Sequence, residues 1–183
     1  MTRLPRALAL AAVLAAAGAP SALSAQQPPG APAAPADTTL LSAEAMVRAV
    51  YRLVSFGPGE RTDWAPVRNL FAPEAVIVLR TSRAANTIFS LDGFINDFIR
   101  FDTIPAVARS GFRETVVRLH ETSYRDIAHL LVLYEAQVLN STRPPQRGID
   151  SWELVRREGR WWIVAVTNDI VTPDAPLPAV LQP

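Results

Sequence analysis

The sequence feature that most constrains the fold is a pair of β-rich runs near the end of the chain. Residues 149–155 and residues 161–168 are rich in β-branched and aromatic side chains, and the polar sequence Arg-Arg-Glu-Gly-Arg separates them. This pattern predicts an antiparallel β-hairpin that turns at Glu158 and Gly159. The three tryptophans in the two runs indicate that the hairpin packs on a core.

The tryptophans also predict which face of the hairpin is buried. The two-residue turn sets Trp152 opposite Ala165, and Trp161 then shares the face of Trp152. Trp162 lies on the other face, because successive side chains of a strand alternate. Since only one face is core, we expect one of the two adjacent tryptophans at an interface or a pocket rim.

Helical periodicity precedes strand periodicity along the chain. Apolar residues recur at helical spacing after Ser42, after Thr62 or Asp63, and after Ser90 or Asp92. Strands are predicted over residues 75–79, 115–122, 127–140, 149–155 and 161–168. This order predicts the α+β class, with N-terminal helices that cover one face of an antiparallel sheet.

The first 25 residues have the organisation of a secretory signal peptide. Arg3 and Arg6 precede an apolar run over residues 7–17, and small residues lead to Ser24 and Ala25. The run is shorter than the ~20 residues of a membrane-spanning helix, so an uncleaved anchor is the less favoured alternative. Because no Arg-Arg pair marks the twin-arginine route, we expect Sec-type export to a bacterial periplasm or the medium, with no membrane contact after cleavage.

The rest of the chain divides into three parts. The Pro/Ala-rich residues 26–37 predict a disordered or semi-rigid linker. Residues 38–172 are expected to form one domain, since the length allows no more. Residues 173–183 form a Pro-rich C-terminal tail, in which prolines end regular structure.

Composition excludes several classes of function. The chain has no cysteine, and therefore no disulfide, no thiol nucleophile and no cysteine-ligated zinc site. Removing Arg3 and Arg6 with the leader takes the formal charge from +1 to −1, which leaves no basic surplus for binding nucleic acid. No Gly-rich phosphate loop, G-x-S-x-G elbow or H-E-x-x-H sequence is present. We expect no cofactor, no metal and no nucleic-acid partner.

Several of these segments, taken in order, carry a resemblance to a known family. A helix ends in Gly57-Pro58, a helix that starts at Asp63-Trp64 leads to Leu70-Phe71-Ala72-Pro73, and the last strands contain Arg147-Gly148-Ile149-Asp150-Ser151 and Gly159-Arg160-Trp161-Trp162-Ile163-Val164. Over residues 40–169 the chain resembles the nuclear transport factor 2-like superfamily, in its bacterial SnoaL-like branch. The resemblance implies a cone-shaped, strongly bent antiparallel sheet wrapped around N-terminal helices. It also implies a cavity at the open end and, frequently, a homodimer through the outer sheet face.

The resemblance leaves the activity open, because the superfamily includes steroid isomerases, polyketide cyclases, dehydratases and binding modules. The steroid isomerases use a tyrosine and carboxylic acids within the cavity. Tyr51, in the first predicted helix, stands roughly where such a tyrosine could sit. The sequence identifies no matching pair of catalytic carboxylates.

The two histidines stand on neighbouring predicted strands. A two-residue turn at Tyr124 and Arg125 places His120 directly opposite His129, where two rings ~5 Å apart could share a metal or a proton. A turn of three or five residues places them on opposite faces. In the two-residue register both histidines lie on a mixed outer face, and Val117 lies on the apolar face toward the helices. We expect a structural or interface role, with a pocket group or a metal ligand as alternatives.

Five other residues are candidates for a site. Asp63 is either a helix N-cap or a general base at the cavity mouth, which needs a raised pKa. Trp64 is either a core or cavity-wall residue or a ligand clamp. Tyr51 and Tyr134 are either satisfied core residues or donors to the cavity. Asn168 either caps a turn or lies at the cavity rim.

Together these observations predict an exported domain that binds a small, mostly apolar ligand in the cone cavity, forms a homodimer, or does both. Tyr51, Trp64, Tyr134 and Asn168 are the predicted ligand-binding residues. The alternative is a cofactor-independent acid–base enzyme, an isomerase, dehydratase or hydrolase. Its candidate catalytic residues are Asp63, Tyr51 and His129.

Overall fold

The computed structural model describes residues 38–82 and 85–183 of the chain. The predicted signal peptide and linker lie outside these residues. Contacts group Asp37–Pro183 into one compact unit. Its elements, in chain order, are η1 (Thr38–Leu41), α1 (Ala43–Leu53), α2 (Trp64–Arg68), β1 (Phe71–Ser82), β2 (Ala85–Ser90), α3 (Leu91–Asp102), α4 (Pro105–Ser110), β3 (Phe112–Tyr124), β4 (Ile127–Val138), β5 (Gln146–Arg157), β6 (Arg160–Ile170) and η2 (Ala179–Leu181).

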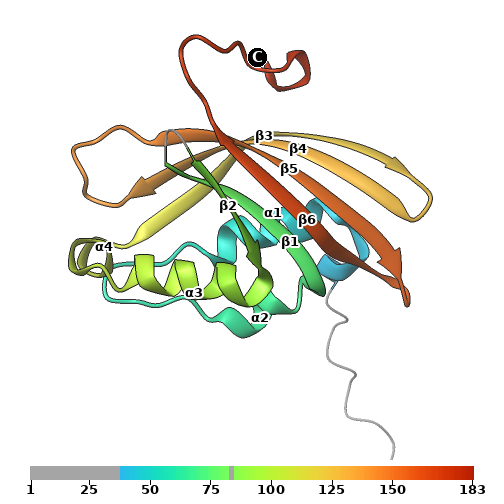
Figure 1. Cartoon of the computed structure of the whole chain (residues 1–183), viewed down its shortest axis with the longest axis horizontal. Coiled ribbons are helices and arrows are strands. Elements are labelled where there is room, and N and C mark those ends of the chain that lie inside the picture. The colour runs from blue at the N-terminus through green and yellow to red at the C-terminus, as the bar shows by residue number, and fades with distance from the viewer. Residues whose placement is uncertain (1–37, 83–84) are drawn as a thin grey trace, which may run out of the picture. The chain divides into compact units, whose positions relative to one another are not determined.

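Six strands form one sheet, in the order β2-β1-β6-β5-β4-β3. Four of the five neighbouring pairs are antiparallel, and β1 pairs with β6 in parallel. Helices α1, α2 and α3 lie on one side of the sheet, which curves over them (Figure 1). The α+β class is confirmed. The parallel pair departs from the expected all-antiparallel sheet, because β1 pairs with β2 on one side and with the last strand, β6, on the other.

The helices begin where polar side chains cap them. The Ser42 hydroxyl accepts from the Ala45 amide at 3.2 Å at the start of α1, and Ser90 accepts from Gly93 at 3.2 Å at the start of α3. The apolar stripe of α1, which includes Met46 and Val47, is completely buried against the inner face of the sheet. No helix in the described part of the chain is long and apolar enough to span a membrane.

The last hairpin turns at Glu158 and Gly159, as predicted, and both residues have positive φ. Its register differs by one residue beyond a bulge between Glu153 and Leu154, so that Trp152 pairs with Val166 instead of Ala165. Trp152 and Trp161 are buried in the core, as expected. Trp162, on the other face, is partly exposed, and the Arg160 guanidinium carbon lies 3.8 Å from its ring centroid.

The hairpin of β3 and β4 turns one residue later than expected, at Arg125 and Asp126, where Arg125 takes a φ of 53°. His120 therefore pairs with Leu131 and not with His129. A bulge between Val116 and Arg118 also reverses one expected orientation. Val116 packs against the core, and Val117 is 39% exposed instead of facing the helices.

Besides the 3-10 helices η1 and η2, the periodicity did not predict strand β2 and helix α4. Strand β2 forms an edge of the sheet, and its Ile88 is 74% exposed. Helix α4 has six residues, of which only Val107 is buried. Neither segment has enough apolar residues at helical or strand spacing for its periodicity to be recognised in the sequence.

Candidate functional site: a cavity between the helices and the inner sheet face

A cavity of about 200 Å³ lies between α1, α3 and the inner face of the sheet. Its walls are mostly apolar and aromatic, and polar side chains from β3, β4, β5 and β6 enter it. The residues that line it are Val50, Tyr51, Val54, Phe71, Leu79, Arg80, Phe94, Phe98, Glu114, Tyr134, Gln146, Asp150, Trp152, Val166, Asn168 and Ile170. This combination of apolar walls and a few converging polar groups is typical of small-molecule sites.

The polar end of the cavity is a hydrogen-bonded cluster centred on Asp150. The Tyr51 hydroxyl donates to Asp150 Oδ2 at 2.5 Å, and it accepts from Trp152 Nε1 at 3.2 Å. Asn168 Nδ2 donates to Asp150 Oδ1 at 2.7 Å and to the Tyr134 hydroxyl at 2.9 Å. Asp150, Asn168 and both tyrosines are less than a tenth exposed. Charge-assisted bonds of this kind compensate for burying a carboxylate.

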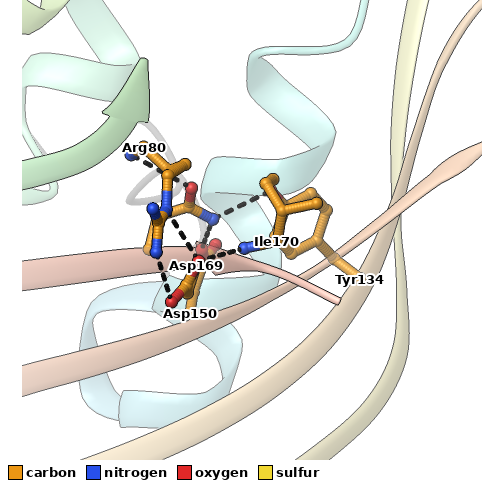
Figure 2. A network of polar contacts seen from close by, with 6 residues as sticks. Arg80, Tyr134, Asp150, Asp169 and Ile170 are labelled. Carbon is orange, nitrogen blue, oxygen red and sulfur yellow. Dashed lines mark hydrogen bonds and ion pairs between the residues drawn. The ribbon is translucent and has the colours of Figure 1, made fainter. Parts of the chain in front are cut away.

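An ion pair at the end of β6 adjoins this cluster (Figure 2). Arg80 Nε and Nη2 lie 2.8 and 2.9 Å from the two carboxylate oxygens of Asp169. The Ile170 amide also donates to Asp169, at 2.7 Å. Arg80 is among the residues that line the cavity, and its guanidinium is bound to Asp169, whose side chain is mostly exposed.

Two carboxyl groups of the cavity titrate far from their ordinary range. Burial raises the pKa of Asp150 to about 6, although the hydrogen bonds from Tyr51 and Asn168 oppose the shift. Burial raises the pKa of Glu114 to about 8, and the nearby negative charge of Asp150 adds to the shift. At neutral pH Asp150 is therefore mainly ionised and Glu114 mainly protonated. The cavity holds about one negative charge.

The tyrosines of the cavity stay protonated. Burial, followed by the charge of Asp150, holds the pKa of Tyr51 well above its ordinary value. The same two causes raise the pKa of Tyr134. Among the described residues, none accepts a hydrogen bond from the Tyr134 hydroxyl, which is itself an acceptor for Asn168. Tyr134 therefore keeps one proton to donate to a ligand.

The strand register explains why these groups converge. Tyr134 of β4 pairs with Gly148 of β5, and a Cβ at Gly148 would overlap the Tyr134 ring. The glycine thus lets the ring lie across β5 toward Asn168. Asp150 pairs with Asn168, and both side chains point to the inner face because Trp152, two residues from Asp150, does so as well.

The structure brings together three of the predicted ligand-binding residues, Tyr51, Tyr134 and Asn168. Trp64, the fourth, does not line the cavity. Its ring packs edge-on against Phe94 and Phe98, at centroid distances of 6.1 and 5.4 Å, so it is a wall residue behind the site.

Two of the candidate catalytic residues lie away from the cavity. Asp63 is exposed and accepts from the Ala65 amide at 3.0 Å, which is the N-cap alternative. His129 lies on the outer face, where its Nε2 is 3.0 Å from the Ser151 hydroxyl. His120 lies on the same face, because His129 pairs with Thr122, which is two residues from His120. No group of three or more His, Asp or Glu residues in residues 38–82 and 85–183 is placed to hold a metal ion.

Asp150 and Glu114 are the site residues that the sequence did not reveal. A signal existed for Asp150, because it lies two residues before Trp152 and so shares its inward face. Glu114 likewise lies two residues after the buried Phe112. An acid at an inward position of an apolar strand is costly unless it has a partner.

Comparison with known proteins shows the fold alone. No family model and no curated protein matches the chain. An uncharacterised protein from Caulobacter vibrioides with a cystatin-like fold is 17% identical, with a TM-score of 0.54 over 72% of this chain and 88% of that chain. A nuclear transport factor 2-like protein from Novosphingobium aromaticivorans is 15% identical, with a TM-score of 0.52 over 76% and 88%. A protein from Parabacteroides distasonis, described only as a candidate ketosteroid isomerase, is 13% identical, with a TM-score of 0.50 over 72% and 90%. The chain has the nuclear transport factor 2-like, or cystatin-like, cone fold.

Proposed function

We propose that the cavity binds a small, mostly apolar molecule that carries one oxygen acceptor. The observation that carries the proposal is the cavity itself, apolar on its walls and closed at one end by the cluster of Tyr51, Tyr134, Asp150 and Asn168. An apolar cavity of about 150 Å³ is large enough for benzene. The volume of about 200 Å³ therefore fits a single ring with a short polar substituent.

The unused donor of Tyr134 decides which end of the ligand meets the cluster. Asp150 already accepts from Tyr51 and Asn168, whereas the Tyr134 hydroxyl has a proton to give. An oxygen acceptor on the ligand supplies the missing partner. An anionic ligand is disfavoured, because Asp150 is charged and the Arg80 guanidinium is bound to Asp169.

Binding is tested with three ring compounds that differ in their substituent. Intrinsic fluorescence and calorimetry would follow titration with benzyl alcohol, toluene and benzoate. We expect benzyl alcohol to bind most tightly and benzoate at least tenfold more weakly, equivalent to about 1.4 kcal/mol. Tyr134→Phe should remove the advantage of benzyl alcohol over toluene, and Tyr124→Phe, at an exposed tyrosine, is the matched control. Failure of all three compounds to bind at millimolar concentration contradicts the proposal.

A second candidate function is acid–base catalysis without a cofactor. Two carboxyl groups in one cavity, with pKa values of about 6 and about 8, favour it. A general base and a general acid work best when their pKa values lie near the working pH. In this reaction Asp150 takes a proton from carbon next to a carbonyl group, and Glu114 or Tyr134 donates to the carbonyl oxygen. Asp150 and Glu114 thus replace Asp63 and His129 as the proposed catalytic residues.

Hydrogen exchange tests the catalytic candidate separately. Solvent deuterium should enter the methyl group of acetophenone faster with the protein than without it, as followed by NMR. Asp150→Asn should abolish the acceleration, and Asp63→Asn should retain it. Equal exchange with wild type and Asp150→Asn leaves binding as the function.

We also propose that the chain is exported and acts outside the cytoplasm. The basic start, the short apolar run and the small residues before Gln26 support this, together with the absence of cysteine.

A further inference from the structure

A hollow of about 390 Å³ lies between the second half of α1 and the start of β3, the strand at the edge of the sheet. Arg48 and Arg52 line this hollow from the helix, and Arg113 lines it from the strand. Arg48 and Arg52 are four residues apart, so they lie on the same face of α1. Three guanidinium groups from two elements therefore border one hollow.

Two of these three arginines have no acid to balance them among the described residues. Arg48 Nε is bound to Glu44 Oε1 at 2.7 Å, which compensates the charge of Arg48. In the part of the chain that the structure describes, the side chains of Arg52 and Arg113 have no hydrogen-bond or ion-pair partner, and both are exposed. Three arginines and one glutamate thus leave a surplus of two positive charges at the hollow.

The neighbouring groups of β3 preserve this surplus and add a donor. Thr115 also lines the hollow, and it shares a strand face with Arg113. Its hydroxyl makes no hydrogen bond with any residue that the structure describes. Glu114, which lines both this hollow and the cavity, is mainly protonated at neutral pH because its pKa is raised to about 8. It therefore adds little negative charge.

The hydroxyl of Ser55 links the two sides of the hollow. It accepts from the Glu114 amide at 2.9 Å, and it donates to the Tyr51 carbonyl at 2.7 Å. One side chain thus joins the backbone of β3 to the last turn of α1. The backbone positions that carry Arg52 and Arg113 are fixed relative to each other, which lowers the entropy cost of binding a ligand between them.

We propose that this hollow binds a tetrahedral dianion on Arg52, Arg113 and Thr115, namely inorganic phosphate or sulfate, or the phosphate group of a monoester. Two uncompensated positive charges match two negative charges. Each guanidinium can donate two parallel hydrogen bonds to the oxygens of such a group, and the threonine hydroxyl can donate to another oxygen. The site is separate from the Asp150 cluster and does not depend on the ligand proposed for the cavity.

Titration of the full-length chain with four anions tests the chemistry of the site. The probes are sulfate, inorganic phosphate, glycerol 3-phosphate and acetate, added at neutral pH and constant ionic strength because salt screens exposed charges. NMR follows the Thr115 amide and the Nε–H groups of Arg52 and Arg113. We expect sulfate to shift these resonances and to bind at least about tenfold more tightly than the monoanion acetate. Tighter binding of glycerol 3-phosphate than of inorganic phosphate identifies a monoester as the ligand class, and the reverse order identifies the free ion.

Substitution of exposed arginines tests the position of the site. Arg52→Gln and Arg113→Gln should each weaken sulfate binding at least about tenfold, equivalent to about 1.4 kcal/mol. Arg52→Lys should retain only part of the affinity, because an ammonium group carries the charge without the planar fork. The matched control is Arg156→Gln, which removes the same charge from an exposed arginine of β5 that does not line the hollow.

The control should bind sulfate within about twofold of wild type, since an exposed charge remote from the hollow is screened. All four substitutions change exposed side chains, so urea midpoints should show that the variants remain folded. Three results overturn the proposal. They are the absence of any shift with sulfate or phosphate at millimolar concentration, a loss of affinity in Arg156→Gln equal to that in Arg52→Gln, and acetate binding as tight as sulfate binding.

Discussion

The Tyr51–Asp150 hydrogen bond joins the first helix to the fifth strand inside the core. The bond is 2.5 Å long, and it is the larger of the two hydrogen-bonding effects that oppose the burial-driven rise in the pKa of Asp150. Tyr51→Phe removes this donor and leaves Trp152 Nε1 without its acceptor. We expect a loss of about 1–3 kcal/mol in the free energy of unfolding and a further rise in the pKa of Asp150.

Urea unfolding and NMR titration of the Asp150 carboxyl check this prediction. The control is Tyr124→Phe, because Tyr124 is 71% exposed and its hydroxyl has no role in the core. We expect a change within about 0.5 kcal/mol for the control. A Tyr51→Phe protein as stable as the control would show that the bond contributes nothing net.

The raised pKa values of the two cavity acids predict that the domain loses stability as the pH rises. The folded-state pKa values are about 6 for Asp150 and about 8 for Glu114, whereas both groups ionise near pH 4 in an unfolded chain, at about 3.9 and 4.3. Between these limits the folded state binds more protons than the unfolded state. The free energy of unfolding therefore falls with rising pH over this window. Above the folded-state values the loss is complete.

Two substitutions separate the contributions of the acids. Glu114→Gln should remove the fall between about pH 6 and pH 8 and about half of the steeper fall below pH 6, and Asp150→Asn should remove the other half of the fall below about pH 6. Urea midpoints measured at a series of pH values give the slopes. Glu121→Gln, at an exposed acid of β3, should leave the slope unchanged. Identical slopes for wild type and Glu114→Gln contradict the assigned burial.

The residues that sequence reasoning found and missed differ in a physical way. Tyr51, Tyr134 and Asn168 were predictable as cavity residues, because buried polar side chains on an apolar face need partners. Asp150 and Glu114 had only their inward strand positions as a signal, and the Tyr51 hydroxyl that makes the burial of Asp150 tolerable comes from a distant element. Tyr51 and Asp150 are separated by 99 positions in the chain. The sequence pattern around either residue does not show that the two side chains lie in contact.

At the scale of elements, the pairing of β4 with β5 depends on one glycine. A side chain at Gly148 would overlap the Tyr134 ring, which packs against Tyr51 at a centroid distance of 5.8 Å. Gly148→Ala should therefore displace Tyr134, break its hydrogen bond with Asn168 and destabilise the domain by about 1–3 kcal/mol. Urea unfolding and the ring resonances of Tyr134 report both effects.

Gly93→Ala is the matched control for this substitution. A Cβ at Gly93, in α3, lies no closer than 3.4 Å to the Phe89 and Ser90 side chains. Since alanine favours a helix over glycine by up to about 1 kcal/mol, we expect equal or higher stability. A Gly148→Ala protein with the stability of Gly93→Ala would mean that the ring moves without cost.

Element types were easier to predict than registers. The turn at Glu158 and Gly159 was readable because a Gly in a polar break between apolar runs is a strong turn signal. The bulges beside Val116 and Glu153 were not readable, because an extra residue in a strand leaves the composition of the run unchanged. Each bulge moved a residue by one position, which was enough to misplace Val117 and the partner of Trp152.

At the scale of the whole molecule, one core joins the helices to the sheet. Its fully buried members run from Met46 in α1 to Ile163 in β6, so the first α-helix and the last strand contribute to the same core. The sequence order of helices and strands predicted the α+β class. The parallel contact of β1 with β6 was beyond such reasoning, because it joins segments far apart in the chain and no local signal sets their relative direction.

The leader and the folded domain should be separable. Among the residues that the structure describes, the main core runs from Ala43 to Val166, and it lies within the compact unit Asp37–Pro183. Protein that begins at Gln26 should therefore unfold in urea within about 0.5 kcal/mol of the full-length chain. If the leader is a signal peptide, protein recovered from the periplasm or the medium should have the intact mass of a chain that begins at Gln26. Exported protein that retains Met1, or protein found only in the cytoplasm, contradicts export by this leader, and a large loss of stability on removing the leader contradicts the independence of the domain.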